Sequence, residues 1–125
     1  MVQIMAGEMR ETTFWILTTL ATGRRHGYAL LQEIEEQSED RVRLRVTTLY
    51  AALERLDTEG LISSDGDERI NGRVRRYFRL TDAGRTALGV EVDRMEASAR
   101  RARANLGLVP TAAIRPGHAP DWRTA

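Results

Sequence analysis

The chain has 125 residues and a mass of 14.1 kDa, which suits one domain and leaves no room for a second independent core. Its composition is that of a soluble globular protein, and its net charge of +1 does not by itself indicate a polyanionic partner. The absence of cysteine excludes disulfides, thiolate metal sites and a cysteine nucleophile, and the two histidines, His26 and His118, stand too far apart to suggest a metal cluster. No apolar run approaches the roughly 18 residues that a membrane-spanning helix needs. We therefore expect a cytoplasmic, non-enzymatic protein with no cofactor and no bound metal.

Two helices are predicted in the first third of the chain. Residues 12–21 place apolar side chains at helical spacing, and Gly23 ends the segment. The pattern restarts over residues 27–37, where Tyr28, Leu31 and Ile34 share one face and glutamates take the solvent side. The stripe of the first helix consists of Thr13, Ile16, Leu17 and Leu20.

A third helix is predicted within residues 42–60, and its pattern is the clearest in the chain. The apolar stripe consists of Leu49, Ala52, Leu53 and Leu56. Gly60 is placed to end this helix with a left-handed cap. Arg41, Arg43 and Arg45 alternate just before it, so positive charge gathers where the helix begins.

A β-hairpin is predicted after the third helix. Residues 61–63 favour a short strand, residues 64–72 have the composition of a loop, and residues 74–80 alternate as a second strand. In the second strand, Val74, Phe78 and Leu80 fall on one side, which Arg76 interrupts near the loop, and Arg75, Tyr77 and Arg79 fall on the other.

A long fourth helix is predicted from Thr81, a good N-cap, to about Asn105. Its apolar positions follow the 4-3-4-3 spacing of a coiled-coil seam rather than that of a broad globular face. These positions are Leu88, Val92, Met95, Ala99, Ala102 and Leu106. We expect the seam to pair with a second copy of the chain; the alternative is an amphipathic helix that packs on its own domain. Residues 107–125 hold all three prolines and predict a flexible tail.

The order of these elements predicts a winged helix-turn-helix, a mainly α fold with a β-hairpin and a long C-terminal dimerisation helix. The DNA-binding domain would span residues 1–80, the dimerisation helix 81–106 and the tail 107–125. In such a domain the third helix enters the major groove and the hairpin reaches the adjacent backbone or minor groove.

Charge placement agrees with this prediction. All nineteen basic residues are arginine, and the segment from Arg69 to Leu80 contains five of them and no acid. We expect Arg73, Arg75 and Arg76 to contact DNA rather than form a solvated hairpin tip, because uncompensated arginines repel one another unless a polyanion is near. We expect Arg43 and Arg45, which lie just before the third helix, to contact DNA as well. On the third helix, Thr47 and Thr48 are candidates for phosphate or base contact, with an N-cap as the alternative for Thr48.

Three segments together resemble the PadR family of bacterial transcriptional regulators over residues 9–105. They are His-Gly-Tyr at 26–28, the stretch from Thr48 to Ile62 (TLYAALERLDTEGLI), and the stretch from Arg75 to Gly84 (RRYFRLTDAG). The resemblance implies a homodimeric repressor of the small subfamily, with one C-terminal helix. It implies DNA contacts for Tyr50 on the recognition helix, for the basic hairpin and for Tyr28 at the start of the second helix. A half-buried packing role is the alternative for Tyr50.

The chain departs from the family pattern ahead of the third helix, where relatives commonly carry Ser-Pro-Gly. Here Arg45, Val46 and Thr47 stand at those positions, and Ala51 replaces a proline after the tyrosine. We therefore expect Thr47 to take over the capping role. Some relatives sense aromatic molecules, so the resemblance also implies that Trp15 is a candidate for effector binding. The alternative is a packing role, because a tryptophan on an apolar helix usually fills a core or a dimer contact.

The sequence thus predicts a homodimeric repressor that binds a palindromic double-stranded operator and is released by a small, aromatic effector. The alternative is a winged-helix protein-interaction module that does not bind DNA.

Overall fold

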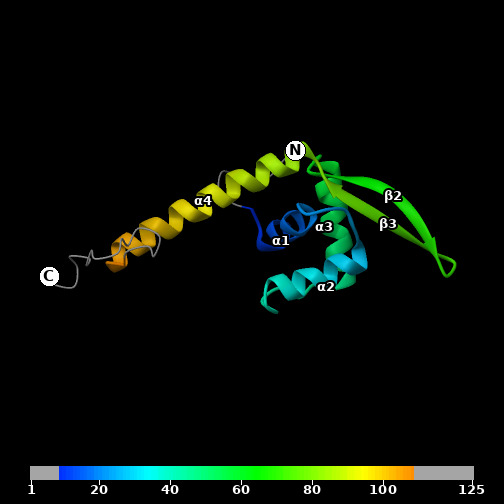
Figure 1. Cartoon of the computed structure of the whole chain (residues 1–125), viewed down its shortest axis with the longest axis horizontal. Helices are drawn as coiled ribbons and strands as arrows, with labels where there is room; N and C mark the ends of the chain where they lie inside the picture. The colour runs from blue at the N-terminus through cyan, green and yellow to red at the C-terminus, as the bar shows by residue number, and fades with distance from the viewer. Residues whose placement is uncertain (1–8, 109–125) are drawn as a thin grey trace. The chain divides into compact units, whose positions relative to one another are not determined.

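The computed structural model describes residues 9–108, and the chain divides into two compact units, Met1–Glu91 and Val92–Ala125. The elements follow one another in the predicted order (Figure 1), and one short strand is present in addition. They are α1 (Glu11–Leu20), β1 (Arg25–His26), α2 (Gly27–Gln37), α3 (Val46–Thr58), β2 (Ile62–Ile70), β3 (Arg73–Leu80) and α4 (Asp82–Leu106). Within residues 9–108, no helix is both long enough and apolar enough to span a membrane.

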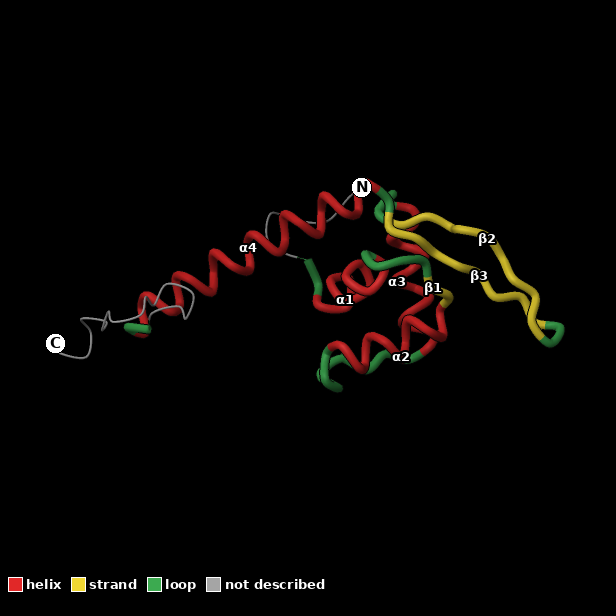
Figure 2. The backbone as a smooth tube through the Cα atoms, in the orientation of Figure 1, coloured by secondary structure: helices red, strands yellow, loops and turns green. Residues whose placement is uncertain are grey.

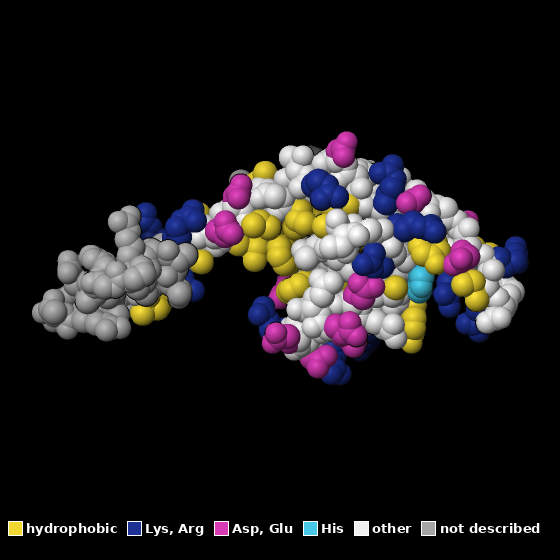
Figure 3. Space-filling view, viewed as in Figure 1, with side chains coloured by type: hydrophobic (Ala, Val, Ile, Leu, Met, Phe, Trp, Pro, Cys, Tyr) yellow, Lys and Arg dark blue, Asp and Glu magenta, His cyan; other side chains and the backbone are white. Residues whose placement is uncertain are grey.

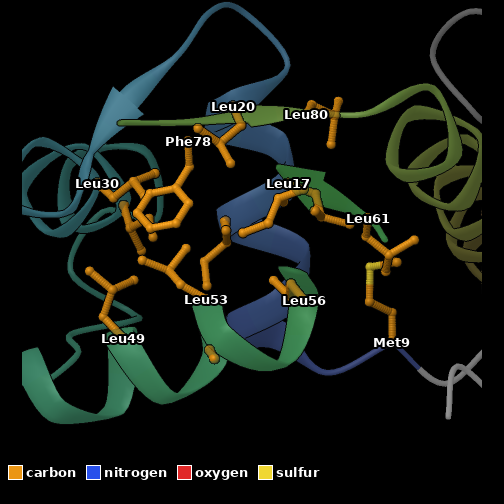
Figure 4. Packing of buried hydrophobic residues seen from close by; sticks show 14 of the residues in the cluster. Met9, Leu17, Leu20, Leu30, Leu49, Leu53, Leu56, Leu61, Phe78 and Leu80 are labelled. Carbon is orange, nitrogen blue, oxygen red and sulfur yellow. The ribbon is translucent and has the colours of Figure 1, made fainter. Parts of the chain in front are cut away.

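The core of the first unit lies between α1, α2, α3 and the base of the hairpin (Figure 4). The stripes predicted for α1 and α3 are confirmed, since every one of their positions is buried. The face predicted for α2 is correct for Ile34, which is buried, and for Leu31, which packs partly against the core, but wrong for Tyr28. The buried row of α2 is Gly27, Leu30 and Ile34, whereas Tyr28 is 63% exposed. Gly27, Leu30 and Ile34 follow the i, i+3, i+7 spacing of one helix face, and this turns Tyr28 toward solvent.

The end of α3 has the predicted left-handed glycine. Gly60 has φ +81°, its N–H donates to the Asp57 carbonyl at 3.0 Å, and the Leu61 N–H donates to the Leu56 carbonyl at 3.0 Å. These two bonds form a Schellman motif. They turn the chain directly into the first strand of the hairpin.

The hairpin is longer than predicted. Strand β2 continues to Ile70, so the connection to β3 is the two-residue turn Asn71–Gly72, both of which have positive φ. Residues 64–70 are therefore not a loop. The turn-forming residues in this stretch instead produce a bulge between Ser64 and Asp67, where Gly66 has φ +87°, and regular pairing with β3 resumes beyond it.

The third strand has no signature in the sequence. Strand β1 pairs antiparallel with β3, Arg25 opposite Phe78 and His26 opposite Tyr77, which makes the strand order β1-β3-β2 (Figure 2). Two residues are too few to show a period-2 pattern. This pairing ties the start of α2 to the hairpin.

Helix α4 starts as predicted. The Thr81 hydroxyl accepts a hydrogen bond from the Gly84 N–H at 3.0 Å and donates one to the Gly60 carbonyl at 2.7 Å. Gly84 lies so close to the Leu61 carbonyl that a Cβ there would overlap it. In the second unit, every described residue, from Val92 to Leu108, is exposed. Apart from Gly107 and Leu108, the predicted tail lies outside the described residues.

Candidate nucleic-acid interface

The outward face of α3 is a single row of side chains. With about 100° of rotation per residue, Thr47, Ala51, Glu54 and Thr58 lie opposite the buried stripe. All four are exposed. The row is flanked by two grooves, one between α3 and β3 and one between α3 and the start of α1.

The start of α3 differs from the prediction. The N-cap residue is Arg45, whose backbone is extended (φ −77°, ψ 153°) and whose side chain makes no capping hydrogen bond. Thr47 does not cap the helix, nor does Thr48, because the helix already begins at Val46 and both threonines lie within its first turn. In the described part of the chain, neither hydroxyl has a hydrogen-bond partner, so both remain available to a ligand.

The His-Gly-Tyr segment has a specific role in placing Tyr50. The phenol ring of Tyr50 lies against Gly27, where any Cβ would overlap it. His26 caps α2, because its Nδ1 accepts a hydrogen bond from the Ala29 N–H at 3.3 Å. Tyr50 is thus packed on one side and still exposed. The packing role and the predicted DNA contact are therefore compatible.

Tyr28 and the hairpin form a second candidate surface. A concave region between α2 and the hairpin tip brings together Tyr28, Arg73 and Arg75, three residues predicted to contact DNA. Ile70, Asn71 and Val74 complete its lining. A tyrosine hydroxyl and two guanidiniums around a groove suit the binding of a phosphate backbone.

The arginines of the hairpin are less isolated than their sequence suggests. Arg76 lies 3.9 Å from the Asp67 carboxylate, and Arg75 stands opposite Glu68 in the strand register. The expectation of arginines without compensating acids is therefore wrong for Arg76, because the longer β2 carries its acids alongside β3. Figure 3 shows basic and acidic side chains interspersed over the hairpin.

The arginines ahead of α3 are also paired at the surface. Arg41 binds Glu11 at 3.0 Å and Arg43 binds Asp40 at 3.4 Å, with all four side chains more than half exposed. Arg45 forms no ion pair within residues 9–108. Exposed pairs of this kind contribute at most about 1 kcal/mol, so a phosphate can replace the carboxylate as partner.

A cluster beside the hairpin escaped the sequence analysis. The Arg24 guanidinium lies 4.0 Å above the Tyr77 ring, and its Nη1 donates to the Asp65 carbonyl at 2.9 Å. The Tyr77 hydroxyl donates to Glu68 at 2.7 Å, which raises the pKa of Tyr77. The His26 ring meets Tyr77 edge-on, and burial together with the nearby Arg75 lowers the pKa of His26. Only the pairing of β1 with β3 brings these residues together.

Two further sets of predicted site residues lie elsewhere. Trp15 is half-buried, packs edge-on against Phe14 at 5.2 Å, and lines none of the three grooves described above. On α4, Leu88 packs partly against the core. The other seam positions, Val92, Met95, Ala99, Ala102 and Leu106, are exposed.

Comparison with known proteins decides the family. The sequence profile of the Transcriptional regulator PadR-like family matches residues 16–90. The chain belongs to this family. The resemblance found in the sequence is therefore confirmed, and the protein is a transcriptional regulator rather than an enzyme.

Relatives of known name agree with this assignment. The transcriptional regulator Rv3488 of Mycobacterium tuberculosis is 39% identical over 85 residues, which cover 68% of this chain and 76% of that protein. Among solved structures, a transcriptional regulator from Clostridium thermocellum is similar with a TM-score of 0.64 and 25% identity, over 74% of this chain and 89% of that one.

A second similar structure is Bacillus subtilis PadR in complex with operator DNA. Its TM-score is 0.59 and its identity 24%, over 66% of this chain and 46% of that chain. The PadR-family fold, a winged helix with a C-terminal helix, is thus confirmed for this protein.

Proposed function

We propose that this PadR-family regulator is a homodimeric repressor that binds palindromic operator DNA through α3 and the β2–β3 hairpin. The observation that carries the proposal is the exposed outer row of α3, which lies in the same unit as the concave surface of Tyr28, Arg73 and Arg75. Together they offer a helix of the size that enters a major groove and a cationic surface for the adjacent backbone.

DNA is the preferred ligand class for two reasons. Among residues 9–108, the hydroxyls of Thr47 and Thr48 have no hydrogen-bond partner, and they lie at the start of α3, where free backbone N–H groups favour phosphate. The similar Bacillus subtilis PadR is described in complex with operator DNA, and this supports the same class of ligand here.

A dimer is supported by the exposed apolar seam of α4. An amphipathic stripe that its own unit leaves in solvent gains stability by pairing with a second copy. Two α3 helices related by a two-fold axis would enter successive major grooves roughly 34–36 Å apart. A dimer covering that length of duplex would exclude other proteins from the same site, which is the simplest route to repression.

The test begins with selection of bound sequences from random DNA. We expect an enriched palindrome, whose affinity falls steeply as salt concentration rises. The double variant Arg75→Ala/Arg76→Ala should reduce the slope of log affinity against log salt by about one unit for each phosphate that the protein no longer neutralises.

The matched control is Arg100→Ala/Arg101→Ala, which removes the same charge from exposed positions of α4 and should leave the slope unchanged. An unchanged slope in the hairpin variant would remove the hairpin from the interface. Selection that enriches no sequence would favour the protein-interaction module instead.

Release by a small aromatic effector has its own test. Trp15 and Trp122 are the only tryptophans, so in a Trp122→Phe variant the fluorescence reports on Trp15 alone. An effector that stacks on Trp15 should quench this signal at the concentration at which it releases the operator. Release without a change in fluorescence would place the effector elsewhere.

A further inference from the structure

Glu54 occupies a position that the function proposed above does not explain. It lies seven residues after Thr47 and three after Ala51, in the middle of the outward row of α3. In the proposed complex, an acidic side chain at this position would face DNA, whose phosphates carry a dense negative charge. Its presence therefore needs a specific reason.

The carboxylate of Glu54 has no cationic partner within residues 9–108. The arginine next to it, Arg55, binds Glu59 at 3.8 Å and the Thr13 hydroxyl at 3.0 Å. Arg76, which lines the same groove as Glu54, lies beside Asp67. The negative charge of Glu54 is thus free to act on whatever approaches the helix.

The base edges of the major groove differ in how they receive a carboxylate. An ionised carboxylate only accepts hydrogen bonds, and guanine presents two acceptors, thymine an acceptor and a methyl group. Adenine has an amino donor, but the acceptor N7 lies beside it. Cytosine presents its N4 amino group as its sole polar group, so it is the base that suits Glu54 best.

The dimensions of α3 allow this contact. Glu54 follows Thr47 by seven positions, which corresponds to ~10 Å along the helix axis and fits within a major groove ~12 Å wide. Between them, Ala51 has no polar group and contacts a base only through its methyl. Glu54 is therefore the residue of this row best able to impose a single base.

We propose that Glu54 is a specificity-determining residue that accepts a hydrogen bond from the N4 amino group of a cytosine in each half-site. The same carboxylate disfavours every site without that cytosine, because it then faces acceptors and phosphates without compensation. This inference rests on the proposed operator binding.

The experiment is selection from random DNA with four proteins: the wild type, Glu54→Gln, Glu54→Ala and Glu36→Gln. Glu36 is an exposed glutamate of α2, so its variant changes the charge equally away from the outward row of α3. We expect a required cytosine in each half-site for the wild type and for Glu36→Gln. Glu54→Gln should shift the preference at that position to adenine, whose N6 and N7 suit an amide, and Glu54→Ala should lose it.

Affinities measured on the selected operator make the test quantitative. Replacing the cytosine should weaken wild-type binding by about 5- to 150-fold, the usual range for one mismatched base pair. The same replacement should change the affinity of Glu54→Ala by less than about threefold, and this variant should bind random DNA more tightly than the wild type.

The outcomes separate the two proposals. If the wild type enriches no sequence, the proposed operator binding fails and the role of Glu54 falls with it. If an operator is enriched but all four proteins share one base preference, or no cytosine is required, only the proposal for Glu54 is overturned.

Discussion

Helices α3 and α4 both carry an apolar stripe, but they differ in what covers it. In α3 every residue of the stripe is buried against α1, α2 and the base of the hairpin, and Leu49 is completely inaccessible. In the second half of α4, Met95 is 41% exposed and Leu106 is 72% exposed. Apolar periodicity therefore predicts which side chains need to be covered by other side chains. Only the fold shows whether the same chain covers them.

The largest effect should come from placing a charge in the exposed stripe. In a two-fold dimer, Met95→Glu would bury two carboxylates without partners, and such burial costs several kcal/mol. We expect monomers in light scattering after size exclusion, and operator affinity reduced by at least about 100-fold, because each half-site is then bound alone.

The control for this variant is Ala97→Glu, which adds the same charge on the opposite side of the helix. It should remain a dimer. A dimeric Met95→Glu protein would show that the seam of α4 is not the interface and would break the comparison between the two helices.

Two glycines at the start of α4 sharpen the comparison, because one lies against the core and the other does not. A methyl group at Gly84 would overlap the Leu61 carbonyl, so Gly84→Ala should lower the free energy of unfolding by about 2–3 kcal/mol. At Gly89 an added Cβ meets nothing within 4 Å among the described residues 9–108. Gly89→Ala should therefore stabilise the helix by about 0.5–1 kcal/mol. Chemical denaturation of both variants checks the pair; equal effects would contradict the close packing at Gly84.

The long elements could be predicted from the sequence because each repeats its pattern over several turns. The stripes of α1 and α3, the cap at Gly60 and the start of α4 at Thr81 all depend on local chemistry. The prediction of a loop over residues 64–70 is wrong, because Asp65 and Gly66 favour a turn and a bulge equally. Only the pairing with β3 selects the bulge.

The candidate site shows the same limit. The sequence predicted DNA contacts for Tyr28, Arg73 and Arg75, and the structure brings the three residues to one surface. The sequence could not show that Arg76 lies beside Asp67, because this contact depends on the register of the hairpin. Nor could the sequence reveal the contact of Gly27 with Tyr50, which depends on how α2 packs against α3.

The contact between Gly27 and Tyr50 predicts an effect of intermediate size. In Gly27→Ala the new methyl would overlap the Tyr50 ring, which must turn away from its place on α3. We expect operator affinity to fall about tenfold, the usual consequence of removing one good interaction with a base pair, while the dimer stays intact. Tyr50→Phe is the companion variant, since it keeps the ring and removes only the hydroxyl. Unchanged affinity in both would exclude Tyr50 from the interface.

The smallest effect concerns pH and is confined to the first unit. Burial and the nearby Arg75 lower the pKa of His26 below its usual 6.5, so between the two values the unfolded chain binds a proton that the folded chain does not. The stability that the neutral ring supplies is present above pH 6.5 and is lost as the pH falls through the folded pKa.

His26→Asn keeps a side-chain acceptor for the Ala29 N–H but does not titrate. Melting temperatures measured from pH 7.5 to 5 should therefore fall more for the wild type, by less than about 4 °C, while the dimer remains unchanged in both. An equal fall in the two proteins would show that the acid sensitivity comes from groups other than His26.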